Sequence, residues 1–326
     1  MARTRSSTSS AGVALALVSS ATFGTSGTFA TSLIDAGWTP GAAVLARVGV
    51  AALILTVPAC LQLWRVWPLL RADGFAALRR SALLVALYGT VAVAGAQLFF
   101  FNALQRISVG VALLLEYLGI VLVVLWMWLR HAQRPRRLTV AGSAGALVGL
   151  LLVLGLSGSQ RPDPLGVLWG LGAAVGLAVY FVLSARAEET LPPVAMTWAA
   201  MLIGAATLAL LGAASALPLQ AVFGGVRFAG QQTSWLVPVL GLSVIGAVAA
   251  YVSGIVAARL LGARLASFLG LTEVLFAVLF AWLFLGQLPS GMQLVGGAFI
   301  IAGVALVRVD ELRPRPGAPS MVRQEG

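Results

Sequence analysis

Residues 108–128, SVGVALLLEYLGIVLVVLWMW, decide the fold, because they form an apolar run of about 21 residues that contains one carboxylate, Glu116. About 20 apolar residues are enough for a helix to cross the hydrocarbon core of a bilayer. At a rise of about 1.5 Å per residue, Glu116 lies about 14 Å along a helix that starts at Ile107, which is close to the middle of the membrane. Inserting a carboxylate there costs about 3 kcal/mol, so we expect Glu116 to have a function.

A second stretch repeats this pattern. Residues 265–285, LASFLGLTEVLFAVLFAWLFL, are apolar apart from a few small polar residues and one carboxylate, Glu273. Like Glu116, Glu273 is followed by a long apolar run that is rich in Leu and Val. We therefore predict two related helices, each of which places a glutamate near the membrane midplane.

The composition indicates a polytopic membrane protein. The chain is 60% hydrophobic and only 10% charged, with a mean hydropathy of +0.99, whereas soluble domains carry about 25% charged residues. No segment shows the alternation of about 10 residues that is typical of lipid-facing strands, so the fold class is predicted to be all-α. The net charge of +11 comes from arginines in short loops, which favours an orientation signal over a nucleic-acid surface.

Hydropathy predicts ten membrane-spanning helices. We expect them over residues 11–34, 40–63, 82–104, 107–129, 138–156, 165–185, 193–213, 235–258, 264–285 and 290–309. With ten spans, both termini lie on the same side. Of the 21 basic residues, only Arg106, Arg161 and Arg227 fall in loops on the other side, and Arg47 lies inside a span. The positive-inside rule therefore predicts that both termini are cytoplasmic in a multi-pass protein of the plasma or inner membrane.

The chain also contains an internal repeat. A shift of about 154 residues places Gly12 on Gly166, Gly142 on Gly296 and Gly149 on Gly303, and small insertions then align Pro40 with Pro193 and Glu116 with Glu273. We predict a first repeat over 11–156 and a second over 165–309, with cytoplasmic tails at 1–10 and 310–326. Five spans per repeat give the two halves inverted topology, which is a transporter architecture with its site near the midplane.

The candidate site residues are the polar and ionisable side chains inside the spans. For Glu116 and Glu273 three roles remain open: binding a substrate ammonium group, carrying a coupling proton, or bonding to neighbouring helices. Arg47 is expected to pair with a glutamate, to extend towards the interface, or to meet a substrate carboxylate. The remaining candidates either line a polar cavity or make hydrogen bonds between helices: Tyr88, Tyr117, Tyr180, Tyr251, Gln97, Asn102 and Thr272.

These residues and motifs resemble the drug/metabolite transporter superfamily, EamA type, over about residues 11–309. The resemblance rests on ATFGTSGTFATSLIDAGWTPGAAVLARVGVAALIL in the first repeat, on FFFNALQRISVGVALLLEYLG at the junction of spans three and four, and on LGLTEVLFAVLFAWLFLGQLPSGMQLVGGAFIIAGVALV in the second. The junction is most similar to the threonine/homoserine exporter-like branch. The sequence departs from the family pattern at Tyr117, Val274 and Gln287. The resemblance implies two five-span EamA repeats and export of amino acids, related metabolites or drugs.

Three functions follow as hypotheses. The first is a secondary transporter that exports small amphiphilic metabolites, above all amino acids or their derivatives, with protons as a possible coupling ion. The second is efflux of cationic hydrophobic drugs. The third is a membrane scaffold that does not transport. No catalytic constellation is present, so we expect no enzyme activity. With one cysteine, Cys60, and one histidine, His131, we also expect no metal site and no cofactor. Because two fused repeats already supply the pseudo-symmetric partner, we expect a monomer.

Overall fold

The computed structural model describes residues 2–72, 76–131, 136–153, 162–187, 192–261, 266 and 269–311. The first half of the chain forms α1 (Ala2–Asp35), α2 (Pro40–Ala72), α3 (Ala76–Leu87), the π-helix η1 (Tyr88–Gly95), α4 (Ala96–Leu104), α5 (Val109–Tyr117), α6 (Gly119–His131) and α7 (Arg137–Val153). The second half forms α8 (Pro164–Ala187), α9 (Pro193–Ala213), β1 (Gly225–Phe228), β2 (Gln231–Ser234), α10 (Leu236–Leu240), the π-helix η2 (Gly241–Ala249), α11 (Ala250–Leu261), α13 (Thr272–Leu285) and α14 (Gly291–Glu311).

The helices make an all-α membrane bundle, as the sequence predicts. Seven helical stretches of the described chain are long and apolar enough to cross a membrane: Ser10–Asp35, Pro40–Arg65, Ala82–Leu104, Val109–Arg130, Pro164–Leu183, Val194–Ala213 and Leu236–Leu261. Shorter apolar helices cover Arg137–Val153, Thr272–Leu285 and Gly291–Val307. Each of these ten stretches overlaps one of the ten predicted spans, although the last three are shorter than a typical membrane-crossing helix.

The helix ends follow local sequence signals. Proline opens α2, α8 and α9 at the first turn, where its missing N–H costs nothing. Asp163 accepts a hydrogen bond from the N–H of Gly166 at 2.8 Å and so caps α8. Ser290 and Gln293 form a reciprocal capping box at the start of α14. Gly286 ends α13 in the left-handed conformation (φ +70°), which glycine adopts without strain.

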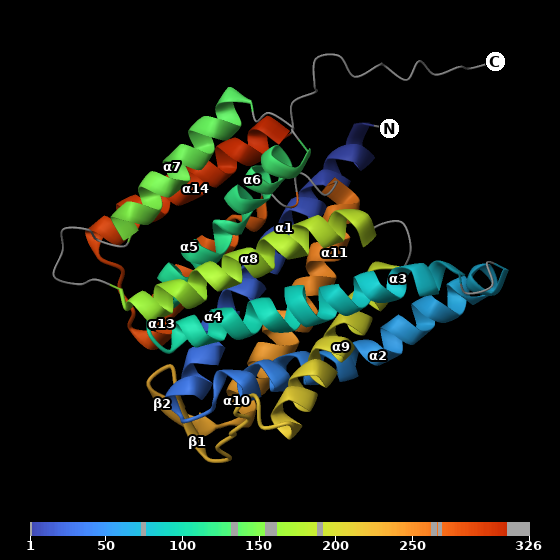
Figure 1. Ribbon diagram of the computed structural model, residues 1–326, viewed down its shortest axis with the longest axis horizontal. Helices are drawn as coiled ribbons and strands as arrows, with labels where there is room; N and C mark the ends of the chain where they lie inside the picture. The colour runs from blue at the N-terminus through green and yellow to red at the C-terminus, as the bar shows by residue number, and fades with distance from the viewer. Residues whose placement is uncertain are drawn as a thin grey trace.

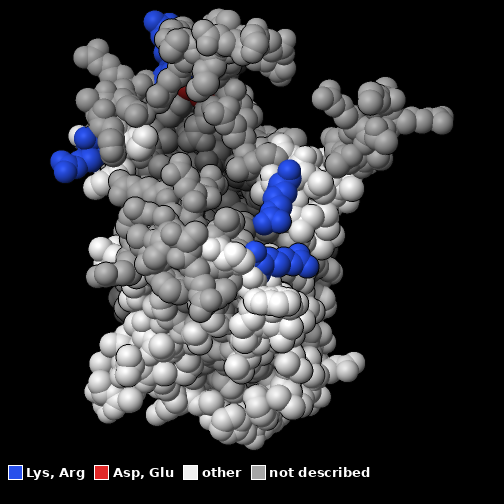
Figure 2. Space-filling model, turned by 90° about the vertical axis from the view of Figure 1, so that its right-hand side faces the viewer, with Lys and Arg blue, Asp and Glu red and all other residues white. Residues whose placement is uncertain are grey.

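The bundle has two distinct ends (Figure 1). We call the end with β1, β2 and the α1–α2 turn the hairpin end, and the end at which α1 begins and α14 ends the terminal end. Successive spans alternate in direction, so α1 runs towards the hairpin end and its counterpart α8 runs away from it. Figure 2 turns the right-hand side of Figure 1 to the viewer, and the arginine side chains visible there lie on its upper part and near its middle, towards the terminal end.

Packing between the helices follows the two-fold relation between the repeats. Helix α1 packs against α11 and α13, and its counterpart α8 packs against α4, α5 and α6. Helices α2 and α9 pack against each other, and so do α7 and α14. The π-helices η1 and η2 occupy corresponding positions in the two repeats, since each lies within the third span of its half. The fully buried side chains Phe101, Leu33, Leu55 and Leu115 belong to the core between these helices.

Some segments differ from the prediction. The predicted span 107–129 is two helices, α5 and α6, which are separated at Leu118. In the second repeat the chain likewise leaves the helix at Leu271, just before α13. The region expected to be a loop after α9 contains the β1–β2 hairpin, in which Gly225 pairs with Ser234 and Phe228 with Gln231.

The predicted tails are shorter than expected. Helix α1 begins at Ala2, so the segment 2–10 continues the first span as a helix. Helix α14 continues to Glu311, and Asp310 is buried rather than solvated. The rest of the predicted C-terminal tail, the predicted end of the first repeat at 156 and Arg264 at the start of the ninth span lie outside the described residues.

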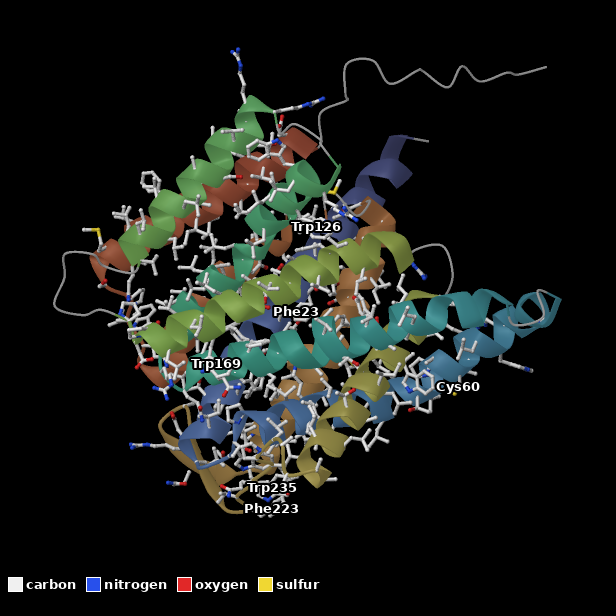
Figure 3. All side chains as sticks on the ribbon, viewed as in Figure 1. Phe23, Cys60, Trp126, Trp169, Phe223 and Trp235 are labelled. Atoms are coloured by element: carbon white, nitrogen blue, oxygen red, sulfur yellow. The ribbon has the colours of Figure 1, made fainter. Side chains whose placement is uncertain are left out.

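Aromatic residues close the hairpin end. The indole N–H of Trp38 donates to the carbonyl of Val222 at 2.9 Å, and the ring lies 6.0 Å from that of Trp235. Phe223 and Trp235, whose rings are 5.0 Å apart, lie together at this end in Figure 3, whereas Trp126 lies far from them. Phe228 of β1 stacks on Phe29 of α1 at 5.1 Å. The hairpin therefore packs onto the first repeat and covers this end of the bundle.

Candidate functional site

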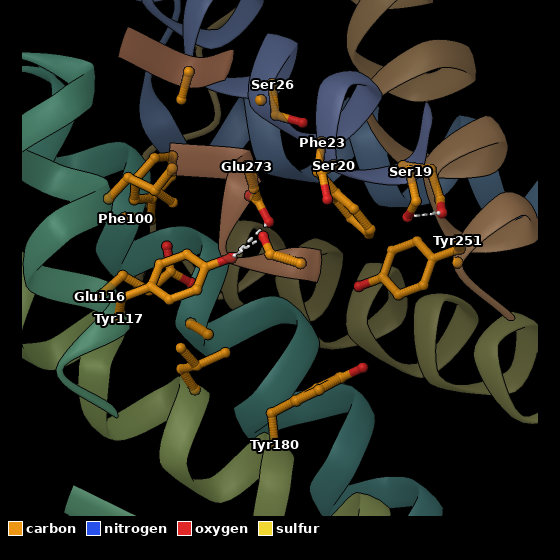
Figure 4. A pocket seen from close by; sticks show the side chains of 18 of the residues that line it. Ser19, Ser20, Phe23, Ser26, Phe100, Glu116, Tyr117, Tyr180, Tyr251 and Glu273 are labelled. Atoms are coloured by element: carbon orange, nitrogen blue, oxygen red, sulfur yellow. Dashed lines mark hydrogen bonds between the residues drawn. The ribbon is translucent and has the colours of Figure 1, made fainter. Parts of the chain in front are cut away.

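A cavity of about 690 Å³ lies between the two repeats. Its walls come from α1, α2, η1, α4, α5, α6, α8, α11 and α13 and so include spans of both halves. It contains seven of the residues predicted from sequence: Arg47, Gln97, Glu116, Tyr117, Tyr180, Tyr251 and Glu273. The lining continues to Arg259 and Ala266 towards the terminal end. Figure 4 shows the side chains of Glu116, Tyr117, Tyr180, Tyr251 and Glu273 around this space.

The two carboxylates lie beside the two helix breaks. Glu116 is in the last turn of α5, two residues before the break at Leu118, and Glu273 is in the first turn of α13, two residues after the break at Leu271. Discontinuous helices with unpaired backbone groups are the usual setting of midplane sites in transporters with inverted repeats. The sequence predicts both glutamates in the membrane but not the breaks that adjoin them.

Tyr117 connects the two broken helices. Its hydroxyl donates to Oε2 of Glu273 at 3.0 Å, and it also lies 3.1 Å from the carbonyl oxygen of Gly270 (Figure 4). A hydroxyl that donates to a carboxylate makes a stronger bond than one between neutral groups. Glu116, which is 8% exposed, makes no hydrogen bond within the described part of the chain. One carboxylate is thus fixed by a partner from the other repeat, and the other is not.

Arg47 contributes a positive charge to the cavity lining. Arg47 is 4% exposed, and its guanidinium donates to the side-chain oxygen of Gln97 and, at 2.8 Å, to the carbonyl of Gly246. That carbonyl, in η2, also accepts a hydrogen bond from the hydroxyl of Ser26 at 3.1 Å. Arg47 therefore connects α2 and α4 of the first repeat with η2 of the second.

The remaining walls are largely aromatic. Phe23 and Tyr251 meet edge to face with ring centroids 5.0 Å apart, and Tyr180 and Phe181 meet edge to face at 5.4 Å. Phe100 completes this set of lining rings. Such rings present apolar faces, while the tyrosines add hydroxyl groups, so the cavity has both apolar and polar surfaces.

Two predicted site residues lie outside the cavity lining. Tyr88 packs on Tyr180 with ring centroids 5.4 Å apart, and so stands behind a lining residue. Asn102 donates to the carbonyl of Leu98 in its own helix at 2.7 Å. Thr272, which we also considered, donates to the carbonyl of Leu269 at 2.7 Å and is not among the lining residues.

Sequence reasoning missed the contribution of α1 and one arginine. Ser19, Ser20 and Ser26 line the cavity, and Ser19 also donates to the carbonyl of Ala250 at 2.8 Å. The available signal was the run SSATFGTSGTFATS at 19–32, which is unusually rich in Ser and Thr for a membrane span. From sequence, Arg259 is only one of the many loop arginines that indicate orientation, whereas in the structure it lines the cavity as an exposed residue near the terminal end.

The site holds no candidate for metal chemistry among the residues that the structure describes. No three His, Cys, Asp or Glu side chains of that part of the chain lie close enough together to hold a metal ion. The two glutamates, the arginine and the hydroxyl groups suit the reversible binding of a small polar molecule, since they supply both charges and many hydrogen-bonding groups.

Comparison with known proteins agrees with this architecture. The model of the EamA-like transporter family matches the chain twice, over residues 10–155 and 164–309. A search of curated proteins found no match. One solved structure, described only as "Crystal structure of protein", is 21% identical, covers 94% of this chain and 98% of its own, and superposes with a TM-score of 0.55. At that identity the likeness shows the fold alone.

The family match covers both halves of the chain and is independent of the cavity geometry. The protein belongs to the EamA-like transporter family of the drug/metabolite transporter superfamily, and it is a membrane transporter of small molecules.

Proposed function

We propose that the protein is a secondary transporter of the plasma or inner membrane that exports small zwitterionic metabolites, chiefly amino acids and their derivatives. The observation that supports this most directly is the set of buried charged residues in the cavity, where Glu116 and Glu273 occur together with Arg47. A free amino acid carries one ammonium and one carboxylate group at neutral pH. A cavity that offers both anionic and cationic groups matches the two opposite charges of such a substrate.

Size and surface agree with a small amphiphilic cargo. Ligand cavities in proteins usually measure about 300–1,000 Å³, and this cavity of about 690 Å³ falls within that range. Its aromatic walls, formed by residues such as Phe23, Phe100 and Phe181, suit an apolar side chain on the substrate. Within the family, we place this chain in the branch that resembles threonine/homoserine exporters, on the sequence at the junction of spans three and four.

The direction of transport follows from the proposed orientation. We place the terminal end and both tails in the cytoplasm, on the arginine distribution, and the β1–β2 hairpin outside. The cavity would then be lined on its cytoplasmic side by Arg259 and Ala266, while aromatic contacts around Trp38 close the outer end. A cavity accessible from the cytoplasm is the state that loads cargo for export. We propose that the transporting unit is the monomer.

Efflux of cationic hydrophobic drugs is the second candidate. It is favoured by the aromatic walls, because rings attract organic cations over their faces, and by the two carboxylates. Arg47 opposes it, since a buried guanidinium that lines the cavity would repel a cation there.

The test is flux in proteoliposomes that contain the purified protein. We expect saturable transport of labelled phenylalanine, leucine or threonine, with unlabelled amino acids competing and hydrophobic cations such as tetraphenylphosphonium competing weakly. A protein with Glu116→Gln and Glu273→Gln together serves as the matched inactive control. Absence of flux for every amino acid, combined with strong flux of tetraphenylphosphonium, would replace the first function by the second. Wild-type flux from the double variant would show that the two glutamates are not needed for transport, and absence of flux for both the amino acids and tetraphenylphosphonium would favour the scaffold.

A further inference from the structure

Arg47 is unusual because it is a buried cation whose direct partners are neutral. Its guanidinium donates to the amide oxygen of Gln97 and to the backbone carbonyl of Gly246. It forms no salt bridge with a carboxylate in the described part of the chain. A buried charge without an opposite charge in contact is expensive, and proteins normally pair it. The arrangement therefore holds a positive charge in position without neutralising it.

The bonds to Gln97 and Gly246 also fix the orientation of the guanidinium. An arginine has five N–H donors in a planar fork. In Arg47 each of the two terminal nitrogens, Nη1 and Nη2, donates one of these bonds. The remaining donors belong to a side chain that lines the cavity. A fixed planar fork with free donors is the geometry that binds a carboxylate with two hydrogen bonds.

The carboxylates of the cavity are kept apart from this cation. Glu273 accepts the hydroxyl of Tyr117, and Glu116 has no hydrogen-bond partner within the described residues. Arg47 still interacts electrostatically with both through the cavity, although neither carboxylate is in contact with it. Opposite charges that face one cavity without touching can be joined by a molecule that carries both charges.

We propose that Arg47 is the receptor for the substrate carboxylate and Glu116 the receptor for its ammonium group, and that Gln97 is a positioning residue that holds Arg47 in place. This deepens the proposed export of zwitterions, on which it rests. Glu273 is assigned the lesser part, because Tyr117 already occupies one of its oxygens. Arg259 is assigned no part in selectivity, because it is exposed near the terminal end rather than buried beside the glutamates.

The experiment compares each amino acid with the amine that lacks only its carboxylate. The probes are phenylalanine with phenethylamine, leucine with isoamylamine, and threonine with 1-amino-2-propanol, each measured as a competitor of flux in proteoliposomes. The quantity of interest is the ratio of the inhibition constants within a pair. For Arg47→Gln we expect this ratio to shift against the amino acid by about tenfold to a hundredfold, which corresponds to the loss of a charge-assisted carboxylate contact.

A second variant keeps Arg47 but gives its guanidinium a carboxylate partner within the protein, so that it can no longer bind the substrate carboxylate. In Gln97→Glu the side chain keeps nearly the same size, and a carboxylate takes the place of the amide group that Arg47 already contacts. We expect the guanidinium to pair with it, so the ratio should shift in the same direction as in Arg47→Gln while the protein stays folded, as judged by its melting temperature and gel-filtration profile. The matched control is Arg259→Gln, which removes the same charge from the same cavity and should change the ratio by less than about threefold.

The outcomes separate this assignment from the function on which it rests. If the wild type transports amino acids but Gln97→Glu and Arg47→Gln weaken the amino acid and its amine by the same factor, Arg47 is not the carboxylate receptor and the proposed function stands. If Arg259→Gln gives the larger shift, the receptor is Arg259 instead. If the wild type transports none of the three amino acids, the proposed function itself is wrong.

Discussion

The two repeats meet in two very different regions, the cavity and the contact between α7 and α14. At the α7–α14 contact the glycines Gly142, Gly149, Gly296 and Gly303 bring the two backbones together. A methyl group on Gly149 would lie only 2.5 Å from the carbonyl oxygen of Gly296, and one on Gly296 only 2.7 Å from that of Gly149. In the cavity, by contrast, the same two repeats are separated by about 690 Å³ of space lined by charged and polar residues.

This difference indicates that the α7–α14 contact stabilises the fold and that the cavity serves binding. Helices that approach through small residues gain close packing without lipid or water between them, and such contacts resist change. Space lined by charges in the membrane is expensive and is retained for binding. We therefore expect changes at the α7–α14 contact to lower the stability of the protein, and changes in the cavity to alter transport while the fold persists.

The largest effect is expected from the glutamates. Glu116→Gln or Glu273→Gln keeps the size and hydrogen-bonding capacity of the side chain but cannot exchange a proton. If protons drive export, each change should abolish accumulation against a gradient while leaving the melting temperature near the wild-type value. Flux in proteoliposomes with and without an imposed pH gradient measures this.

The control for the glutamates is Asp163→Asn, a loss of the same charge at the exposed hairpin end. It should leave accumulation unchanged within about twofold, because exposed charges interact weakly. Variants of both glutamates that still concentrate substrate with the wild-type pH profile would show that the carboxylates do not couple protons to transport.

The next effect concerns the α7–α14 contact, where α7 supplies its own control. Gly149→Ala places a methyl group against the backbone of α14 and should destabilise the protein by about 1–3 kcal/mol. Gly145→Ala is the same change one turn earlier, where the nearest atom is 3.9 Å from the added carbon. It should be neutral or stabilise by up to about 1 kcal/mol through helix propensity. Thermal unfolding in detergent compares the two, and equal melting temperatures would contradict the role given to this contact.

A loss of stability of similar size is expected at a polar contact between the same two helices, α7 and α14. Asp310 of α14 accepts the hydroxyl of Thr139 at 2.6 Å and its N–H at 3.3 Å, and it lies 3.9 Å from Arg136, so it caps the start of α7. Asp310→Ala should cost about 2 kcal/mol, because it leaves buried donors without an acceptor. Asp163→Ala, at the exposed cap of α8, should cost only about 1 kcal/mol. The reverse order of melting temperatures would be incompatible with this reading of Asp310.

The smallest effect is expected from Tyr117→Phe. It removes one hydroxyl that donates to Glu273 and should change the KM of transport by about threefold to tenfold, the equivalent of one hydrogen bond. Tyr180→Phe is the matched control, since it removes a hydroxyl from the same cavity that has no hydrogen-bond partner among the described residues. A change in KM that is the same for both variants would mean that the bond between Tyr117 and Glu273 has no special role.

The sequence shows which polar residues lie inside the spans, but not the direction in which each side chain faces. Gln97 and Asn102 are both polar residues of α4, and the sequence treats them alike. Five residues of helix separate them, which is a rotation of about 140°, so only one of them can face the cavity. The structure turns Gln97 inward and leaves Asn102 bonded to its own helix. Hydropathy does not report this rotation, because lipid and protein neighbours are equally apolar.

The sequence by itself determined the fold class, the approximate spans and the presence of two carboxylates inside related helices. It could do so because the bilayer requires long apolar runs, and because a charge within such a run is conspicuous. Only the tertiary structure decided that the chain leaves the helix at Leu118 and Leu271, that η1 and η2 are π-helical, and that the segment after α9 pairs as a hairpin. It also decided that Arg47 bonds to Gln97 and Gly246 rather than to a glutamate. These features depend on which segments touch. A contact such as that between Arg47 and Gly246, which are 199 positions apart, leaves no local signal in the chain.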